Sequence, residues 1–157
     1  MVRKLFFILT TAILIVAVFT GIVSAFDVRQ PTVIKANLEN VGAFATATHA
    51  TGINYAVDNG ELFAGRTGEW RKIATPDNLI VGAVAADSSR PSALYIGAAN
   101  EMAVYRTTDR GQHWMRVPLT DETVGGVTSL AFDSVERVLY VGTDTAGVFR
   151  LRDVGSS

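Results

Sequence analysis

Short sequence blocks recur along this chain at an interval of 40 to 45 residues. Tyr55, Tyr95 and Tyr140 occupy the same place in the segments INYAV, ALYIG and VLYVG, at spacings of 40 and 45 residues. Trp70 and Trp114 repeat at a similar spacing of 44 residues. A repeat of this length forms one supersecondary unit that packs on its neighbours. We therefore expect three units, at about residues 41–80, 81–123 and 124–157.

Each unit contains short apolar segments separated by turn residues. In the first unit, Asp58-Asn59-Gly60 separates two such segments, and Asn-Gly is a strong hairpin signal. Four short strands in a repeat of 40 to 50 residues are typical of a β-propeller blade. We predict an all-β domain of about three propeller-like, four-stranded units, open or incomplete as a propeller. The strands are expected at 42–48, 53–57, 61–65 and 69–74, then at 82–87, 93–98, 102–107 and 113–119, and finally at 127–133, 138–143 and 147–153.

The N-terminus differs sharply from the repeats. Arg3 and Lys4 precede an uncharged apolar run from Leu5 to Phe26, which spans about 33 Å as a helix, enough to cross a bilayer core of about 30 Å. The small residues Val23-Ser24-Ala25 also suit a signal-peptide cleavage site, but the run is longer than an ordinary h-region. We expect residues 1–26 to be an uncleaved transmembrane anchor of a bacterial cytoplasmic membrane. The basic flank would stay inside, which places the following domain in the periplasm.

Composition narrows the remaining classes of function. We expect residues 27–40 to form a linker, in which a short strand at 32–36 could complete the third unit. From residue 27 onward the chain carries 12 basic and 15 acidic side chains, a net charge of −3, so no basic surplus supports nucleic-acid binding. The chain has no cysteine, which excludes disulfides and thiolate chemistry. The apolar anchor, and not surface charge, is expected to hold the protein on the lipid bilayer.

The segment from Thr107 to Trp114, TTDRGQHW, resembles the Asp-box of BNR-type β-propellers, in which Ser or Thr, Asp, Gly and Trp recur at fixed positions. The resemblance implies a tight hairpin: the Asp109 carboxylate accepts backbone N–H groups, Gly111 takes a positive φ, and the Trp114 ring packs beneath. Residues 150–155, which include Asp153 and Gly155, look like a second box. Residues 67–70 look like a shortened one.

Asp-boxes are known from sialidases, so a catalytic role has to be weighed. In the family the Asp109 position forms a peripheral turn, away from the central site. Arg106 and Arg150 are equivalent by repeat, so we expect them on equivalent blade surfaces and not around one ligand. The three repeated tyrosines look like core strand residues. His49 and His113 lie 64 residues apart, and no phosphate-binding or nucleophile motif is present. We expect no catalytic residues, no metal site and no cofactor.

Three units are fewer than the four to eight blades of a closed propeller, and open ends expose strand edges and apolar faces. The ends could be covered by docking on a larger membrane protein complex, by pairing into a homodimer with six blades, or by a compact fold with blunted edges. We favour docking. Because similar propellers include assembly factors of photosynthetic complexes, the resemblance points to an accessory subunit of a bacterial respiratory or photosynthetic electron-transfer complex. A secreted or tethered glycan- or protein-binding module is the alternative.

Overall fold

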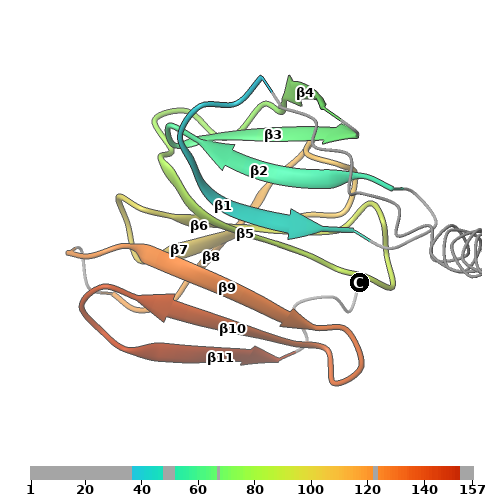
Figure 1. Cartoon of the computed structure of the whole chain (residues 1–157). Helices are drawn as coiled ribbons and strands as arrows, with labels where there is room; N and C mark the ends of the chain where they lie inside the picture. The colour runs from blue at the N-terminus through green and yellow to red at the C-terminus, as the bar shows by residue number, and fades with distance from the viewer. Residues whose placement is uncertain (1–36, 48–51, 67, 122–123, 153–157) are drawn as a thin grey trace, which may run out of the picture. The chain divides into compact units, whose positions relative to one another are not determined.

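The computed structural model describes residues 37–47, 52–66, 68–121 and 124–152. Within these ranges the chain forms three antiparallel β-sheets (Figure 1). Sheet 1 has the order β1-β2-β3-β4, sheet 2 the order β5-β6-β7-β8, and sheet 3 the order β11-β10-β9. The strands are β1 Val41–Thr46, β2 Asn54–Asp58, β3 Glu61–Arg66, β4 Glu69–Lys72, β5 Val81–Ala86, β6 Leu94–Ala98, β7 Ala103–Thr107, β8 Met115–Pro118, β9 Val127–Asp133, β10 Val138–Thr143 and β11 Val148–Arg152.

These strands confirm the predicted all-β class. Each strand lies within or next to one predicted segment, and the turn at Asn59-Gly60 has φ values of 51° and 78°, as a two-residue hairpin requires. Residues 1–36 lie outside the described residues, and with them the predicted anchor (Arg3, Lys4, Leu5, Phe26), most of the linker and the possible strand at 32–36. The described part of the chain contains no helix long and apolar enough to cross a membrane.

The repeat of the sequence is a repeat of strand register. In each sheet the first strand is irregular near its start, and each repeated tyrosine lies on the second strand opposite an alanine of the first: Ala45↔Tyr55, Ala85↔Tyr95 and Ala131↔Tyr140. Side chains alternate between the two sides of a strand. Each sheet therefore has a tyrosine face, which carries this tyrosine, and an opposite tryptophan face, named after Trp70 in sheet 1 and Trp114 in sheet 2.

The core lies between the sheets. The tyrosine face of sheet 1 packs on the tryptophan face of sheet 2, through a cluster that includes Tyr55, Leu62 and Leu94. The tyrosine face of sheet 2 packs in the same way on sheet 3, through Tyr95 and Leu139. Full burial of one such leucine contributes about 1.5–3 kcal/mol. The first strands β1, β5 and β9 are neighbours in space, so the three sheets follow one another as successive blades (Figure 1).

One repeated position is not in the core. Tyr55 and Tyr95 are 2% and 0% exposed, whereas Tyr140 is 41% exposed. The expectation that all three tyrosines are core residues is therefore wrong for Tyr140. The reason is tertiary: a next sheet covers the tyrosine faces of sheets 1 and 2, and no described element packs on that of sheet 3.

A pair of equivalent glycines tests the packing between sheets. A Cβ at Gly82 would overlap the carbonyl oxygen of Val127 in sheet 3, whereas one at Gly42 would meet nothing within 4 Å. Backbone cannot yield easily, so Gly82→Ala should lower the free energy of unfolding by about 1–3 kcal/mol. Gly42→Ala should change it by less than about 1 kcal/mol. Urea unfolding followed by tryptophan fluorescence measures both, and equal effects would contradict the packing described here.

Candidate functional site

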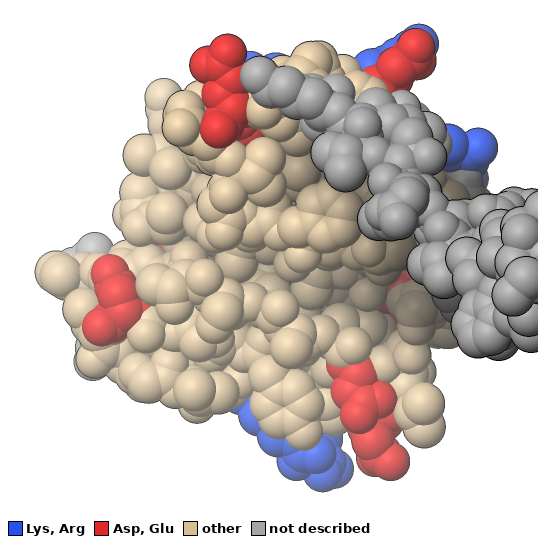
Figure 2. Space-filling model, viewed as in Figure 1, with Lys and Arg blue, Asp and Glu red and all other residues tan. Residues whose placement is uncertain are grey.

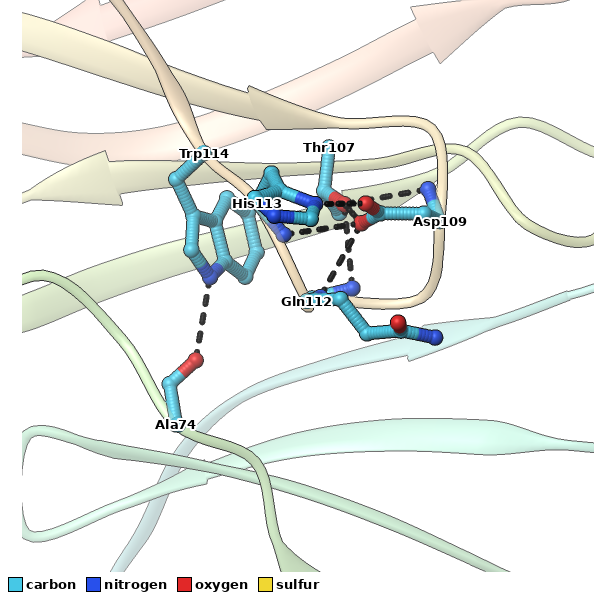
Figure 3. Close-up of polar contacts among 7 residues, drawn as sticks. Ala74, Thr107, Asp109, Gln112, His113 and Trp114 are labelled. Atoms are coloured by element: carbon cyan, nitrogen blue, oxygen red, sulfur yellow. Dashed lines mark hydrogen bonds and ion pairs between the residues drawn. The ribbon is translucent and has the colours of Figure 1, made fainter.

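The loop between β7 and β8 is held by the side chains of Thr107 and Asp109. Thr107 Oγ1 donates a hydrogen bond to Asp109 Oδ1 at 2.7 Å and accepts one from the backbone N–H of Gly111 at 3.0 Å. Asp109 Oδ1 also accepts the backbone N–H groups of Gln112 and His113, each at 3.0 Å, and Oδ2 lies 2.6 Å from His113 Nδ1 (Figure 3). The carboxylate is thus used entirely within its own loop.

These contacts affect the pKa of the Asp109 carboxyl group. The hydrogen bond from the His113 backbone, then those from the Thr107 hydroxyl and the His113 ring, hold the pKa of Asp109 well below its ordinary value. Because each donor stabilises the charged form, the carboxylate stays ionised through the physiological range. A carboxylate whose oxygens already accept hydrogen bonds from its own loop is poorly suited to proton transfer.

Trp114 connects this loop to sheet 1. Its indole Nε1 donates to the carbonyl oxygen of Ala74 at 3.0 Å, and the ring joins the core between sheets 1 and 2 (Figure 3). Gly111 has φ = 89°, and a Cβ there would lie 3.3 Å from the ring, so glycine suits both the turn and the close approach. The structure therefore brings Thr107, Asp109, Gly111 and Trp114 together. Asp153 and Gly155 lie outside the described residues.

Two open hollows lie on sheet 1 and at its border with sheet 2. One of about 370 Å³ lies beside the loop and is lined by Ala74, Thr75, Pro76, Gln112, His113 and Trp114 among others. The other, also about 370 Å³, lies at the edge of sheet 1 beside Arg66, Glu69 and Arg71. Both open broadly to the surface and lack the enclosed apolar walls of an ordinary small-molecule site.

A polar cluster that the sequence analysis missed lies between sheets 2 and 3. The fully buried Asp87 carboxylate accepts a hydrogen bond from Arg137 at 2.5 Å and bonds from the hydroxyl and backbone of Ser89. Burial alone would raise the pKa of Asp87, but these bonds together outweigh it and lower that pKa. Arg137 also lies over the Phe132 ring, which stacks on Tyr95. Burial raises the pKa of Tyr95.

Arg106 and Arg150 occupy equivalent positions, as predicted. They pair with Tyr95 and Tyr140, respectively, on the tyrosine faces of sheets 2 and 3. Arg106 is buried between the sheets, whereas Arg150 is exposed. The two arginines therefore do not converge on one ligand. Among the described residues, no group of three or more His, Cys, Asp or Glu side chains is placed to hold a metal ion.

The most distinctive surface is one edge of the domain, which we call the turn end. It contains the β2–β3, β6–β7 and β10–β11 turns together with the connections between sheets, which backbone hydrogen bonds hold side by side. The described carboxylates there are Glu39, Asp58, Glu61, Asp77, Glu101, Asp121 and Asp144. Figure 2 shows acidic side chains at this end, on the left, separated by uncharged surface.

Basic groups do not balance this charge. Among the described residues at or near the turn end, Lys72 is paired with Glu61 and Arg116 with Glu101, each at 2.6 Å. The hydrogen bond from Arg116 lowers the pKa of Glu101. At the opposite edge, the β5–β6, β7–β8 and β9–β10 turns carry Arg90, Arg110 and Arg137 together with Asp87, Asp109, Asp133 and Glu136. The turn end is thus acidic, whereas the opposite edge carries charges of both signs.

Comparison with known proteins identifies the fold. No protein-family model matches the chain, and no curated protein matches it. Solved structures do: one described as YCF48 bound to D1 peptide has a TM-score of 0.59 and 17% identity over 79% of this chain and 41% of its own. A luciferin-regenerating enzyme has a TM-score of 0.57 and 15% identity over 76% and 47%. The GH74 enzyme of Niastella koreensis has a TM-score of 0.56 and 16% identity over 75% and 22%.

These neighbours are β-propeller proteins, so the predicted propeller fold is confirmed. The chain spans less than half the length of each. At such low identity the likeness concerns the fold, which serves both enzymes and binding proteins.

The contribution of the Asp109 charge to the stability of the fold can be tested by changing the pH. A carboxylate whose folded pKa is depressed contributes stability above its unfolded pKa of about 3.9, and this contribution is lost as pH falls through the folded value. Asp109→Asn should therefore be less stable than wild type at pH 7, and the difference should shrink below about pH 4. Urea unfolding between pH 7 and pH 2.5 measures it. If the two proteins differed in stability by the same amount at pH 7 and at pH 2.5, the Asp109 charge would not stabilise the fold.

Proposed function

We propose that this protein is a non-catalytic, membrane-anchored accessory subunit that works by binding protein. Residues 5–26 hold it in the bacterial cytoplasmic membrane, and its periplasmic β-domain docks on a larger membrane protein complex. A respiratory or photosynthetic electron-transfer complex is the class of partner that we propose. The observation that carries the docking role is the turn end, where carboxylates outnumber basic groups and lie near exposed aliphatic side chains.

The aliphatic groups at the turn end are unusually open to solvent. Val41, Ile80 and Val124 are 48%, 52% and 74% exposed, and they lie at or just before the first strands of the three sheets. Apolar side chains within a polar rim are the usual composition of a protein-binding surface. A partner that fits would present apolar side chains bordered by lysine or arginine, because the rim is acidic.

The turn end is also rigid. Asn100 Oδ1 accepts the backbone N–H of Ile80 at 3.1 Å, and its amide nitrogen donates to Asn78 O at 3.0 Å. Asp144 Oδ1 accepts the backbone N–H of Gly126 at 2.8 Å, and the Asp144 N–H donates back to Gly126 O. Turns fixed in this way lose little conformational entropy when a partner binds. This supports recognition of a protein surface without rearrangement.

The comparisons give the proposal limited support. The structure of YCF48 bound to D1 peptide pairs this fold with a peptide, which favours a protein partner here. The GH74 and luciferin-regenerating enzymes share the fold as well. A glycosidase needs two free carboxyl groups about 5–9.5 Å apart beside the sugar, and the Asp109 carboxylate is already held by donors of its own loop. We therefore propose binding and not catalysis.

The glycan- or protein-binding module remains the second candidate, because one observation favours it. Such a module should expose an aromatic and arginine cluster on one face, and the exposed Tyr140 and Arg150 are register partners on sheet 3. It should also be stable without partners, whereas an accessory subunit should be recovered with its complex.

The test is purification of the tagged protein from its own membranes in mild detergent, with mass spectrometry of its N-terminal peptide and of co-eluting proteins. Wild type should retain its N-terminus and recover a membrane complex in stoichiometric amount at low salt. Asp77→Lys or Asp121→Lys should reduce the recovered partner about tenfold or more, because like charges then oppose each other. Glu136→Lys makes the same charge change at the opposite edge and should have no effect. A wild-type protein without stoichiometric membrane partners would contradict the proposal.

A further inference from the structure

The two outermost faces of the three sheets are built as packing faces. Sheet 2 is covered on both sides, and it shows what each kind of face looks like when packed. The tyrosine face of sheet 3 and the tryptophan face of sheet 1 carry equivalent positions, but no described element packs on either. Comparing them with sheet 2 position by position shows what each lacks.

The tyrosine face of sheet 3 repeats the one that sheet 2 buries. In sheet 2 this face carries Tyr95 and Val104, both 0% exposed, next to the buried Arg106. The equivalent Tyr140 and Val148 of sheet 3 are 41% and 75% exposed. The Arg150 position of sheet 3 corresponds to the buried Arg106 of sheet 2. The same pattern of residues is therefore buried on sheet 2 and exposed on sheet 3.

The tryptophan face of sheet 1 is also exposed where the same face of sheet 2 is buried. Val84 on the packed face of sheet 2 is 4% exposed, whereas its equivalent Phe44 is 56% exposed. Phe44 makes an edge contact with Trp70, at 5.9 Å between ring centroids. The indole Nε1 of Trp70 is buried without a hydrogen-bond partner, although the equivalent nitrogen of Trp114 donates to Ala74 at the edge of the neighbouring sheet. The exposed Phe44 ring thus occupies a position that is buried on the packed face of sheet 2.

We propose that two copies of this chain associate head to tail, with the tyrosine face of sheet 3 in each copy packed on the tryptophan face of sheet 1 in the other. The pairing adds two contacts of the same kind as those that join sheet 1 to sheet 2 and sheet 2 to sheet 3. It gives six sheets, within the range of four to eight that closes a propeller. Head-to-tail contacts form a finite ring when their rotation closes. This inference is independent of docking, because the turn end stays free on such a ring.

A second copy fits these faces better than an unrelated partner does, because of side-chain size. In the packed pair, the small Ala83 and Ala85 of sheet 2 share a core with the large Leu130 and Phe132 of sheet 3. Across the proposed contact, Ser129 and Ala131 would face Phe44, the equivalent of Leu130. At the Phe44 position, small residues would thus oppose a large one as they do in the packed contact.

Cross-linking tests the pairing directly, because the chain has no cysteine of its own. Thr46 is equivalent to Phe132, which stacks on Tyr95, and Ala131 is equivalent to Ala85, the register partner of Tyr95. A mixture of full-length Thr46→Cys and Ala131→Cys chains in mild detergent should form a covalent dimer with a short bismaleimide. Either variant alone should not, because identical positions lie across the ring from each other. Cross-linking of one variant with itself, or none in the mixture, would overturn the head-to-tail contact.

The mass of the full-length chain in detergent, measured by light scattering, completes the test. Wild type should have twice the 16.8 kDa of one chain. Tyr140→Glu or Phe44→Glu should convert it to a single copy, with the fold checked by circular dichroism. Val135→Glu is the matched control: Val135 is exposed in the β9–β10 turn, outside both faces, so the pair should persist. A single copy for wild type, an assembly larger than two, or a Tyr140→Glu protein that still pairs would each overturn the proposal.

Discussion

The packing of one sheet's tyrosine face on the next sheet's tryptophan face is the contact on which the rest of the structure depends. Each sheet has three or four strands, and a single antiparallel sheet of this size cannot bury both of its faces. The alanines of the first strand allow close approach, and the tyrosine of the second strand supplies a large apolar ring. Tyr55 and Tyr95 are buried in this way. Because the contact is modular, the same surface can be repeated within the chain or between chains.

Polar groups fix the relative position of the sheets that apolar packing brings together. Trp114 bonds to Ala74 across the first contact, and Arg137 bonds to the buried Asp87 across the second. Apolar contacts tolerate small displacements, whereas a buried carboxylate without its partner would be costly. The turns at one edge are fixed by further bonds, so the acidic groups there keep a defined arrangement. A stable scaffold with one acidic edge is suited to recognising another protein.

Local features could be predicted well from the sequence. The strands and the Asn59-Gly60 turn follow from alternation and turn chemistry, which act over a few residues. The contacts of Thr107 and Asp109 lie within eight residues of the chain, so a short motif contains nearly all of the information. The Asp87–Arg137 pair could not be found in this way, because 50 residues separate its members. A usable signal existed in the equivalence of Asp87 and Asp133, which both follow the same alternating strand, but nothing local identified the arginine.

The sequence by itself determined that the chain forms repeated short strands, about where they lie, and which hairpins join them. Only the tertiary structure decided which repeated side chains are buried. Tyr95 and Tyr140 have similar apolar neighbours along the chain and the same place in the register, yet one is enclosed and the other is open. The physical reason is that strand formation depends on residues close in sequence, whereas burial depends on whether another sheet covers that face. The clustering of carboxylates at one edge has the same origin, because it comes from turns that only the packed sheets bring together.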